Sequence, residues 1–223
     1  VRTKRPGLQL LRALCLIGVS LLFTTGLRYI PLAEATSVVF LAPLLVTALS
    51  VPLLGERVTR AQWLAVLAGF IGVLIVVRPG GALFTPAILL PLAAALCFGF
   101  YQLLTRMLSG IDSPTTSNFL TGILNSLIMT AILPFFWTTP TLVHGLFMIG
   151  LGTCGMFGHM LMTQAFRHAA PAMLPPFSYG QILFAGLYGY LIFDHTPDRF
   201  AVVGITVICL SGLAVAWAQR KKD

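Results

Sequence analysis

The stretch ATSVVFLAPLLVTALSVPLL, residues 35–54, runs for twenty residues without a charged side chain. A membrane-spanning helix needs about 20 consecutive, mostly apolar residues to cross the hydrocarbon core. Similar runs, each bounded by charge, proline or glycine, occupy residues 8–29, 61–77, 86–108, 116–137, 142–166, 172–193 and 200–218. The sequence therefore predicts an all-α integral membrane protein with about eight transmembrane helices.

The composition supports this fold class. Of 223 residues, 57% are hydrophobic and 9% are charged, and the mean hydropathy is +0.93. So few charges cannot cover the surface of a water-soluble domain of this length. The formal net charge of +8 does not indicate nucleic acid, because the basic residues lie in the gaps between apolar runs and form no continuous face.

The distribution of these basic residues predicts an orientation. If the chain starts on the inner side and alternates, eleven cations fall inside: Arg2, Lys4, Arg5, Arg12, Arg57, Arg60, Arg106, Arg167, Arg220, Lys221 and Lys222. Three fall outside: Arg28, Arg78 and Arg199. The protein is predicted to lie in the cell membrane. Because inner loops are enriched in Lys and Arg, both ends of the chain are predicted to face the cytoplasm.

The chain also resembles itself weakly at an offset of roughly 139 residues. GLRYIP (26–31) aligns with AFRHAAP (165–171), and LLGERVTR (53–60) aligns with IFDHTPDR (192–199). The first three helices thus correspond to the last three, in opposite orientation, as in inverted-repeat transporters. The helices at 86–108 and 116–137 have no counterpart, so we expect two more helices before Val1 and a ten-helix, five-plus-five fold.

In that arrangement, residues 1–79 are the last three helices of the first repeat, and residues 84–220 are the second repeat. We expect this chain alone not to transport, whereas a form extended by two N-terminal helices should.

Several segments carry a family resemblance. They are PLAEATSVVFLAP (31–43), LGER (54–57), GFIGVL (69–74), APA (170–172), PFSY (176–179) and SGL (211–213). Together they resemble the EamA domain of the drug/metabolite transporter superfamily along essentially the whole chain. The resemblance implies ten helices in two inverted halves and the export or import of metabolites and drugs. Asp194 and His195 replace the expected Gly-Glu pair in the second half.

Polar residues deep in the predicted helices are the candidates for the solute pathway, because each is unfavourable in lipid unless it is paired. They are Tyr101, Gln102, Asn118, Asn125, His159, Gln164, Tyr179 and Gln181. Taken singly, each amide could simply bond a neighbouring helix, and His159 fits a packed neutral histidine better than a proton carrier. As a set, aromatic rings with amides predict a cavity for a planar or amphipathic solute.

Prolines and one acidic residue complete the candidates. Pro43, Pro175 and Pro176 interrupt predicted helices and indicate hinges or a vestibule, because freed carbonyls are tolerated where they line a cavity. Glu34 opens the helix at 35–54. It either complements the positive end of that helix dipole or couples transport to an ion or proton.

These features favour a secondary transporter that moves a small-molecule solute by alternating access. The sequence contains no P-loop, no His-Glu-x-x-His and no paired carboxylates, so it predicts no enzyme, metal or cofactor. Two alternatives stay open: a membrane enzyme acting on lipid, and a non-transporting scaffold subunit. Polar side chains meeting between helices favour the transporter, whereas an ionisable cluster at one interface favours the enzyme.

Overall fold

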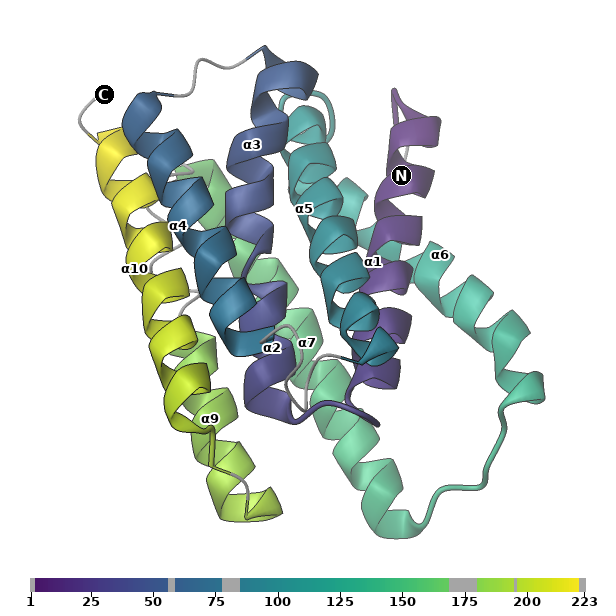
Figure 1. Ribbon diagram of the computed structural model, residues 1–223. Coiled ribbons are helices and arrows are strands. Elements are labelled where there is room, and N and C mark those ends of the chain that lie inside the picture. Colours follow the sequence, from purple (N-terminus) through teal and green to yellow (C-terminus); the bar gives the residue numbers. More distant parts are fainter. Residues whose placement is uncertain (1–2, 56–58, 78–84, 169–179, 195, 221–223) are drawn as a thin grey trace.

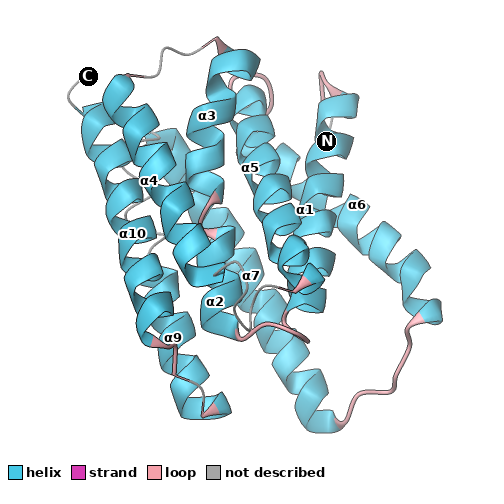
Figure 2. Cartoon of the chain, in the orientation of Figure 1, coloured by secondary structure: helices cyan, strands magenta, loops and turns pink. Residues whose placement is uncertain are grey.

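The computed structural model describes residues 3–55, 59–77, 85–168, 180–194 and 196–220. Every regular element in these ranges is a helix (Figure 2). The elements are α1 (Pro6–Gly26), α2 (Leu32–Val39), α3 (Ala42–Leu54), α4 (Arg60–Val77), η1 (Pro86–Ile88), α5 (Leu89–Ser109), α6 (Pro114–Ile132), η2 (Leu133–Phe135), α7 (Leu142–His168), α9 (Gly180–Phe193) and α10 (Arg199–Arg220).

The all-helical fold agrees with the prediction, and each predicted span coincides with helix in the described part of the chain. Five segments there are long and apolar enough to cross a membrane: Pro6–Gly26, Leu32–Leu53, Pro86–Ser109, Pro114–Phe135 and Leu142–Met162. Three more apolar segments are shorter: Trp63–Val76, Phe184–Phe193 and Arg199–Ala214. The start of the predicted helix at 172–193 lies outside the described residues.

The helix predicted over residues 35–54 is wrong as one continuous element. The structure divides it into α2 and α3 at Phe40 and Leu41. The cause is Pro43, which occupies the first turn of α3. A continuous helix would need residue 43 to donate its N–H to the carbonyl of Val39, and proline has no N–H to donate. The break therefore falls one turn before the proline.

The helices form two groups that α2 and α3 join (Figure 1). In one group α1 packs against α5 and α6, and in the other α4 packs against α10. The apolar core lies mainly between α2, α3, α4, α5 and α10; its least exposed members include Ala35, Val38, Leu44, Ala95 and Ile208. Polar side chains, in contrast, occupy the space between α1, α5 and α6.

Glycines allow α4 and α10 to approach closely. A Cβ atom built on Gly204 of α10 would lie 2.6 Å from the carbonyl oxygen of Gly72 on α4. The reciprocal Cβ on Gly72 would lie 3.0 Å from the carbonyl oxygen of Gly204. Small residues at such contacts let helix backbones pack in a membrane, where no hydrophobic effect drives helices together.

By contrast, α7 is exposed along almost its whole described length. Gly150, Gly152, Gly155 and Gly158 on this helix have open space where a Cβ would sit. The preceding helix α6 leans away from the bundle toward its C-terminal end (Figure 1). It is followed directly by the short 3-10 helix η2 (Leu133–Phe135), which contains Pro134.

Candidate functional site

A buried arginine organises the polar side of the molecule. Arg12 lies in the second turn of α1 and is 0% exposed. All five N–H groups of its guanidinium donate hydrogen bonds. The acceptors are Thr105 Oγ1 at 2.8 Å, the Ser117 carbonyl oxygen at 2.9 Å, Thr121 Oγ1 at 2.6 Å, Tyr101 Oη at 3.0 Å and Asn118 Oδ1 at 3.1 Å. Each acceptor is a neutral oxygen, so a full positive charge is buried among dipoles alone.

Helical spacing explains why these acceptors converge. Residues three or four apart lie on one helix face, which aligns Ser117 and Asn118 with Thr121 on α6, and Tyr101 with Thr105 on α5. Thr105 Oγ1 also donates to the carbonyl oxygen of Tyr101 at 2.7 Å. At the start of α6, the Ser113 hydroxyl accepts from the backbone N–H of Thr116 at 3.1 Å. This N-cap fixes where α6 begins and hence which face it presents to α1.

Tyr101 links Arg12 to a fourth helix. The guanidinium carbon of Arg12 lies 4.7 Å from the Tyr101 ring centroid. On its other side, Tyr101 Oη lies 3.4 Å from Nδ1 of His159 on α7, and the two rings meet edge to face. Since Tyr101 Oη accepts from Arg12, its own hydrogen is free to point toward His159.

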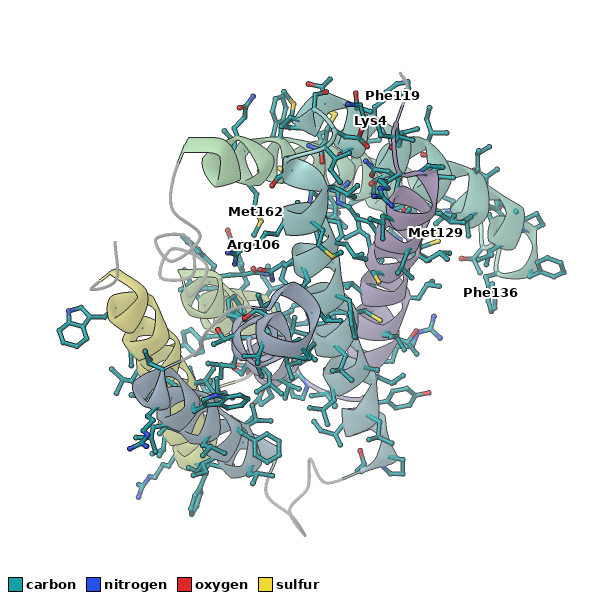
Figure 3. The ribbon with its side chains drawn as sticks, turned by 90° about the horizontal axis from the view of Figure 1, so that it is seen from above. Lys4, Arg106, Phe119, Met129, Phe136 and Met162 are labelled. Carbon is teal, nitrogen blue, oxygen red and sulfur yellow. The ribbon has the colours of Figure 1, made fainter. Side chains whose placement is uncertain are left out.

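Gln9 and Asp112 close the N-terminal end of this arrangement. Gln9 Nε2 donates to Ser117 Oγ at 2.8 Å and to Asp112 Oδ2 at 2.9 Å. Asp112, in the turn between α5 and α6, also accepts from the Thr3 hydroxyl and the Lys4 backbone N–H. In the view from above, Lys4 and Phe119 are drawn in the same region of the molecule, where α1 meets α6 (Figure 3). The hydrogen bonds from Thr3 and Gln9 lower the pKa of Asp112, so it is ionised at neutral pH.

We refer to eight residues as the Arg12 cluster: Gln9, Arg12, Tyr101, Thr105, Ser117, Asn118, Thr121 and His159. Gln9 Oε1 and, further along α6, Asn125 Oδ1 are buried acceptors with no hydrogen-bond partner among the described residues. Buried polar atoms in proteins are nearly always paired. The cluster and its neighbourhood therefore hold unused hydrogen-bonding capacity.

Three of the predicted pathway residues, Tyr101, Asn118 and His159, meet in this cluster. Gln102 is half-buried and turned about 100° from Tyr101 around α5. Gln164 and Gln181 are exposed. Tyr179, Pro175 and Pro176 lie outside the described residues.

Glu34 lies in the first turn of α2, as predicted, and is 3% exposed.

The predicted place of Arg12 among the cations at the inner membrane face is wrong. The charge pattern groups it with the inner-face cations, but the structure buries it between α1, α5 and α6. Its position inside the predicted span 8–29 was the available signal, because an ionisable residue within a span indicates a functional site by default. Gln9, Thr105, Ser117 and Thr121 gave no comparable signal, since hydroxyls and amides are common at helix ends.

Long apolar helices packed around buried polar side chains are typical of a multi-pass membrane protein. The family model described as the EamA-like transporter family matches residues 4–78 and 85–217. The chain belongs to this family. It is accordingly a secondary transporter of small metabolites and not a lipid-modifying enzyme, which confirms the class predicted from the sequence.

Curated relatives cover the chain almost completely. The S-adenosylmethionine uptake transporter of Rickettsia prowazekii is 26% identical over 221 residues, 99% of this chain and 75% of that protein. The riboflavin transporter of Vibrio cholerae is 30% identical over 226 residues, 100% of this chain and 76% of that protein. A solved crystal structure contains a chain that is 21% identical to this one. The match covers 98% of this chain and 80% of that chain with a TM-score of 0.69, so the two chains share the fold.

Proposed function

We propose that the solute of this transporter is a small metabolite with a heteroaromatic ring system, carried across the cell membrane, and that the Arg12 cluster is where the solute binds. The observation that carries the proposal is the complete burial of a charged side chain among neutral partners. On insertion scales, an arginine costs about 2.5–3.5 kcal/mol at the centre of a span, and less toward the end of the span where Arg12 lies. A helix contact alone could be made with apolar residues and would not need that charge.

The chemistry of the cluster fits such a solute. Tyr101 and His159 supply aromatic rings that stack with a planar group, and Asn118 and Thr121 supply polar atoms that fix its orientation. The relatives named as S-adenosylmethionine and riboflavin transporters act on solutes that combine a heteroaromatic ring with polar groups. We place S-adenosylmethionine first and riboflavin second among candidate solutes.

We further propose the ten-helix inverted-repeat architecture, with residues 1–79 in the first repeat and residues 84–220 in the second. Two contacts support it, because helices that the repeat makes equivalent pack together: α4 with α10, and α2 with α9. The exposed α7, with its five open glycines, offers the face that additional helices would cover. In this arrangement transport proceeds as one half rocks against the other.

The proposed orientation has both ends of the chain in the cytoplasm. With Arg12 removed from the inner group, the basic residues divide ten to three, which still favours this orientation. The first turn of α1 and the last turn of α10 lie toward the same end of the bundle (Figure 1), in support of it. Glu34, in the first turn of α2, is the carboxylate through which a proton or another ion would couple to transport, with Pro43 as the adjacent hinge.

The test is flux of radiolabelled S-adenosylmethionine and riboflavin into proteoliposomes that contain the full-length protein. We expect saturable flux of at least one solute, and a loss of about tenfold or more in Arg12→Gln, because the variant removes the charge that orients and strengthens the hydrogen bonds of the cluster to the solute, worth about 1.5–3 kcal/mol. The matched control is Arg28→Gln, which removes an exposed cation outside the cluster. Absence of saturable flux for both solutes, or equal losses in the two variants, contradicts the proposal.

A further inference from the structure

We infer that the Arg12 cluster selects solutes that carry a carboxylate. This inference rests on the proposed solute-binding role and adds the chemical group that the site recognises.

The charge balance at Arg12 is incomplete. The guanidinium is 0% exposed and its five acceptors are hydroxyl, amide and carbonyl oxygens. The acidic side chain nearest in the hydrogen-bond network is Asp112, which Gln9 and Ser117 separate from Arg12. Asp112 is already engaged by three donors from the N-terminal segment. Buried charges in proteins are usually paired, so the cluster lacks an anion.

The hydroxyls that accept from Arg12 keep their own hydrogens for other partners. A hydroxyl that accepts from a guanidinium must direct its own hydrogen elsewhere. Arg12 imposes this on Tyr101 Oη and on Thr121 Oγ1. The Tyr101 hydrogen has His159 Nδ1 as its neighbour at 3.4 Å, which is long for a hydrogen bond. Arg12 thereby converts two ambivalent hydroxyls into donors that face away from it.

A carboxylate matches this arrangement. We expect its two oxygens to accept from the Tyr101 and Thr121 hydroxyls while Arg12 keeps its own hydrogen bonds. The guanidinium would then lie roughly 5–6 Å from the carboxylate, with a hydroxyl oxygen between them. Charge-assisted hydrogen bonds are about twice as strong as neutral ones. A neutral solute would leave the charge of Arg12 unbalanced, and a purely cationic solute would be repelled. Arg12 thus acts as a positioning and specificity-determining residue, while Tyr101 and Thr121 make the contacts.

The burial of Gln9 adds a place for a second solute group. Gln9 is 2% exposed, and its Oε1 has no partner among the described residues. It lies three residues before Arg12, on the same face of α1. An acceptor at that position suits an ammonium or amino group, so an amino acid end, which carries both groups, fits the cluster better than a simple acid.

The experiment compares two solutes that differ by one carboxylate. S-adenosylmethionine and decarboxylated S-adenosylmethionine share the adenosine, the sulfonium and the amine. Their affinities are measured by thermal shift and by competition against radiolabelled S-adenosylmethionine, on purified full-length protein. We expect decarboxylation to weaken binding about 10- to 100-fold in the wild type. In Arg12→Gln the two affinities should become equal within about threefold, whereas Arg28→Gln keeps the wild-type ratio.

Two further variants protect the test against a folding defect of Arg12→Gln. Arg12→Lys keeps the charge, so it should retain a preference for the carboxylate. Thr121→Val keeps the charge and removes one donor, so it should reduce the preference several-fold without abolishing binding.

The outcomes separate the inference from the proposed function. Equal wild-type affinity for the two compounds overturns carboxylate selection but leaves solute transport standing. A wild-type preference that persists in Arg12→Gln overturns the role of Arg12. If the wild type binds neither compound and carries neither S-adenosylmethionine nor riboflavin, the proposed function itself is wrong.

Discussion

The close contact between α4 and α10 predicts that Gly204→Ala destabilises the protein. The new Cβ would lie 2.6 Å from the Gly72 carbonyl oxygen, 2.6 Å from Val76 Cγ2 and 2.9 Å from the Val76 backbone nitrogen. Ordinary van der Waals contacts to a Cβ are 3.4–4 Å. Because two of the three atoms belong to backbone, they cannot rotate away, and α10 has to move from α4 by a large fraction of an ångström.

The size of the effect follows from two opposing terms. Overpacking a well-packed contact costs about 1–3 kcal/mol. The better helix propensity of alanine raises the free energy of unfolding by up to about 1 kcal/mol. We therefore expect Gly204→Ala to lower the free energy of unfolding by about 1–2 kcal/mol, and to lower the melting temperature by several degrees.

Two other glycines provide matched comparisons. Gly122→Ala on α6 places the same methyl group in open space, so only the propensity term acts and stability should stay equal or rise by up to about 1 kcal/mol. Gly69→Ala brings its Cβ within 1.9 Å of Leu44 Cδ1. That atom is the end of a flexible side chain, which can change rotamer, so the loss should fall between the other two.

The assay is reversible unfolding in mixed detergent micelles, followed by circular dichroism and repeated by thermal scan. The expected order of stability is Gly122→Ala, then Gly69→Ala, then Gly204→Ala. If Gly204→Ala is as stable as the wild type, or Gly122→Ala loses as much as Gly204→Ala, the close α4–α10 approach does not exist in solution.

Three further predictions use the same protein. Ser113→Ala removes the α6 N-cap acceptor for Thr116 N–H and should cost about 1 kcal/mol of unfolding free energy; no change in that assay would show that α6 starts elsewhere. Asp112 has a lowered pKa because Thr3 and Gln9 donate to it, so its contribution is present above the unfolded-state pKa near 3.8 and is lost as pH falls through the lower folded-state value. The melting temperature of the wild type should thus drop more steeply than that of Asp112→Asn between about pH 4 and pH 2, the window below the ordinary carboxyl pKa, and parallel curves would contradict it. Reporter fusions after Gln219 and in the turn at 55–60 should report cytoplasm, and fusions near Pro79 and Thr139 the outside; a consistent reversal would overturn the orientation.

The amino-acid sequence by itself determined the fold class and most helix positions. Apolar runs of span length are a local property, because a bilayer admits few structures other than closed hydrogen-bonded helices. The break near Pro43 was visible as a proline, and its position one turn earlier follows from the missing N–H. Tyr101, Asn118 and His159 were also accessible, since polar side chains inside apolar runs stand out. Residues 169–179, which include Tyr179, Pro175 and Pro176, lie outside the described residues.

Only the tertiary structure decided the place of Arg12 and the closeness of α4 and α10. An arginine in the second turn of a span can extend to the headgroups or turn into the protein, and both fit the same sequence. The packing of α5 and α6 against α1 selects the second, because those helices bring five neutral oxygens within hydrogen-bonding distance. In the sequence, Gly204 likewise cannot be distinguished from other glycines in membrane helices; its close contact depends on the position of α4. Contacts between residues far apart in the chain depend on helix rotation and crossing, which no local pattern specifies.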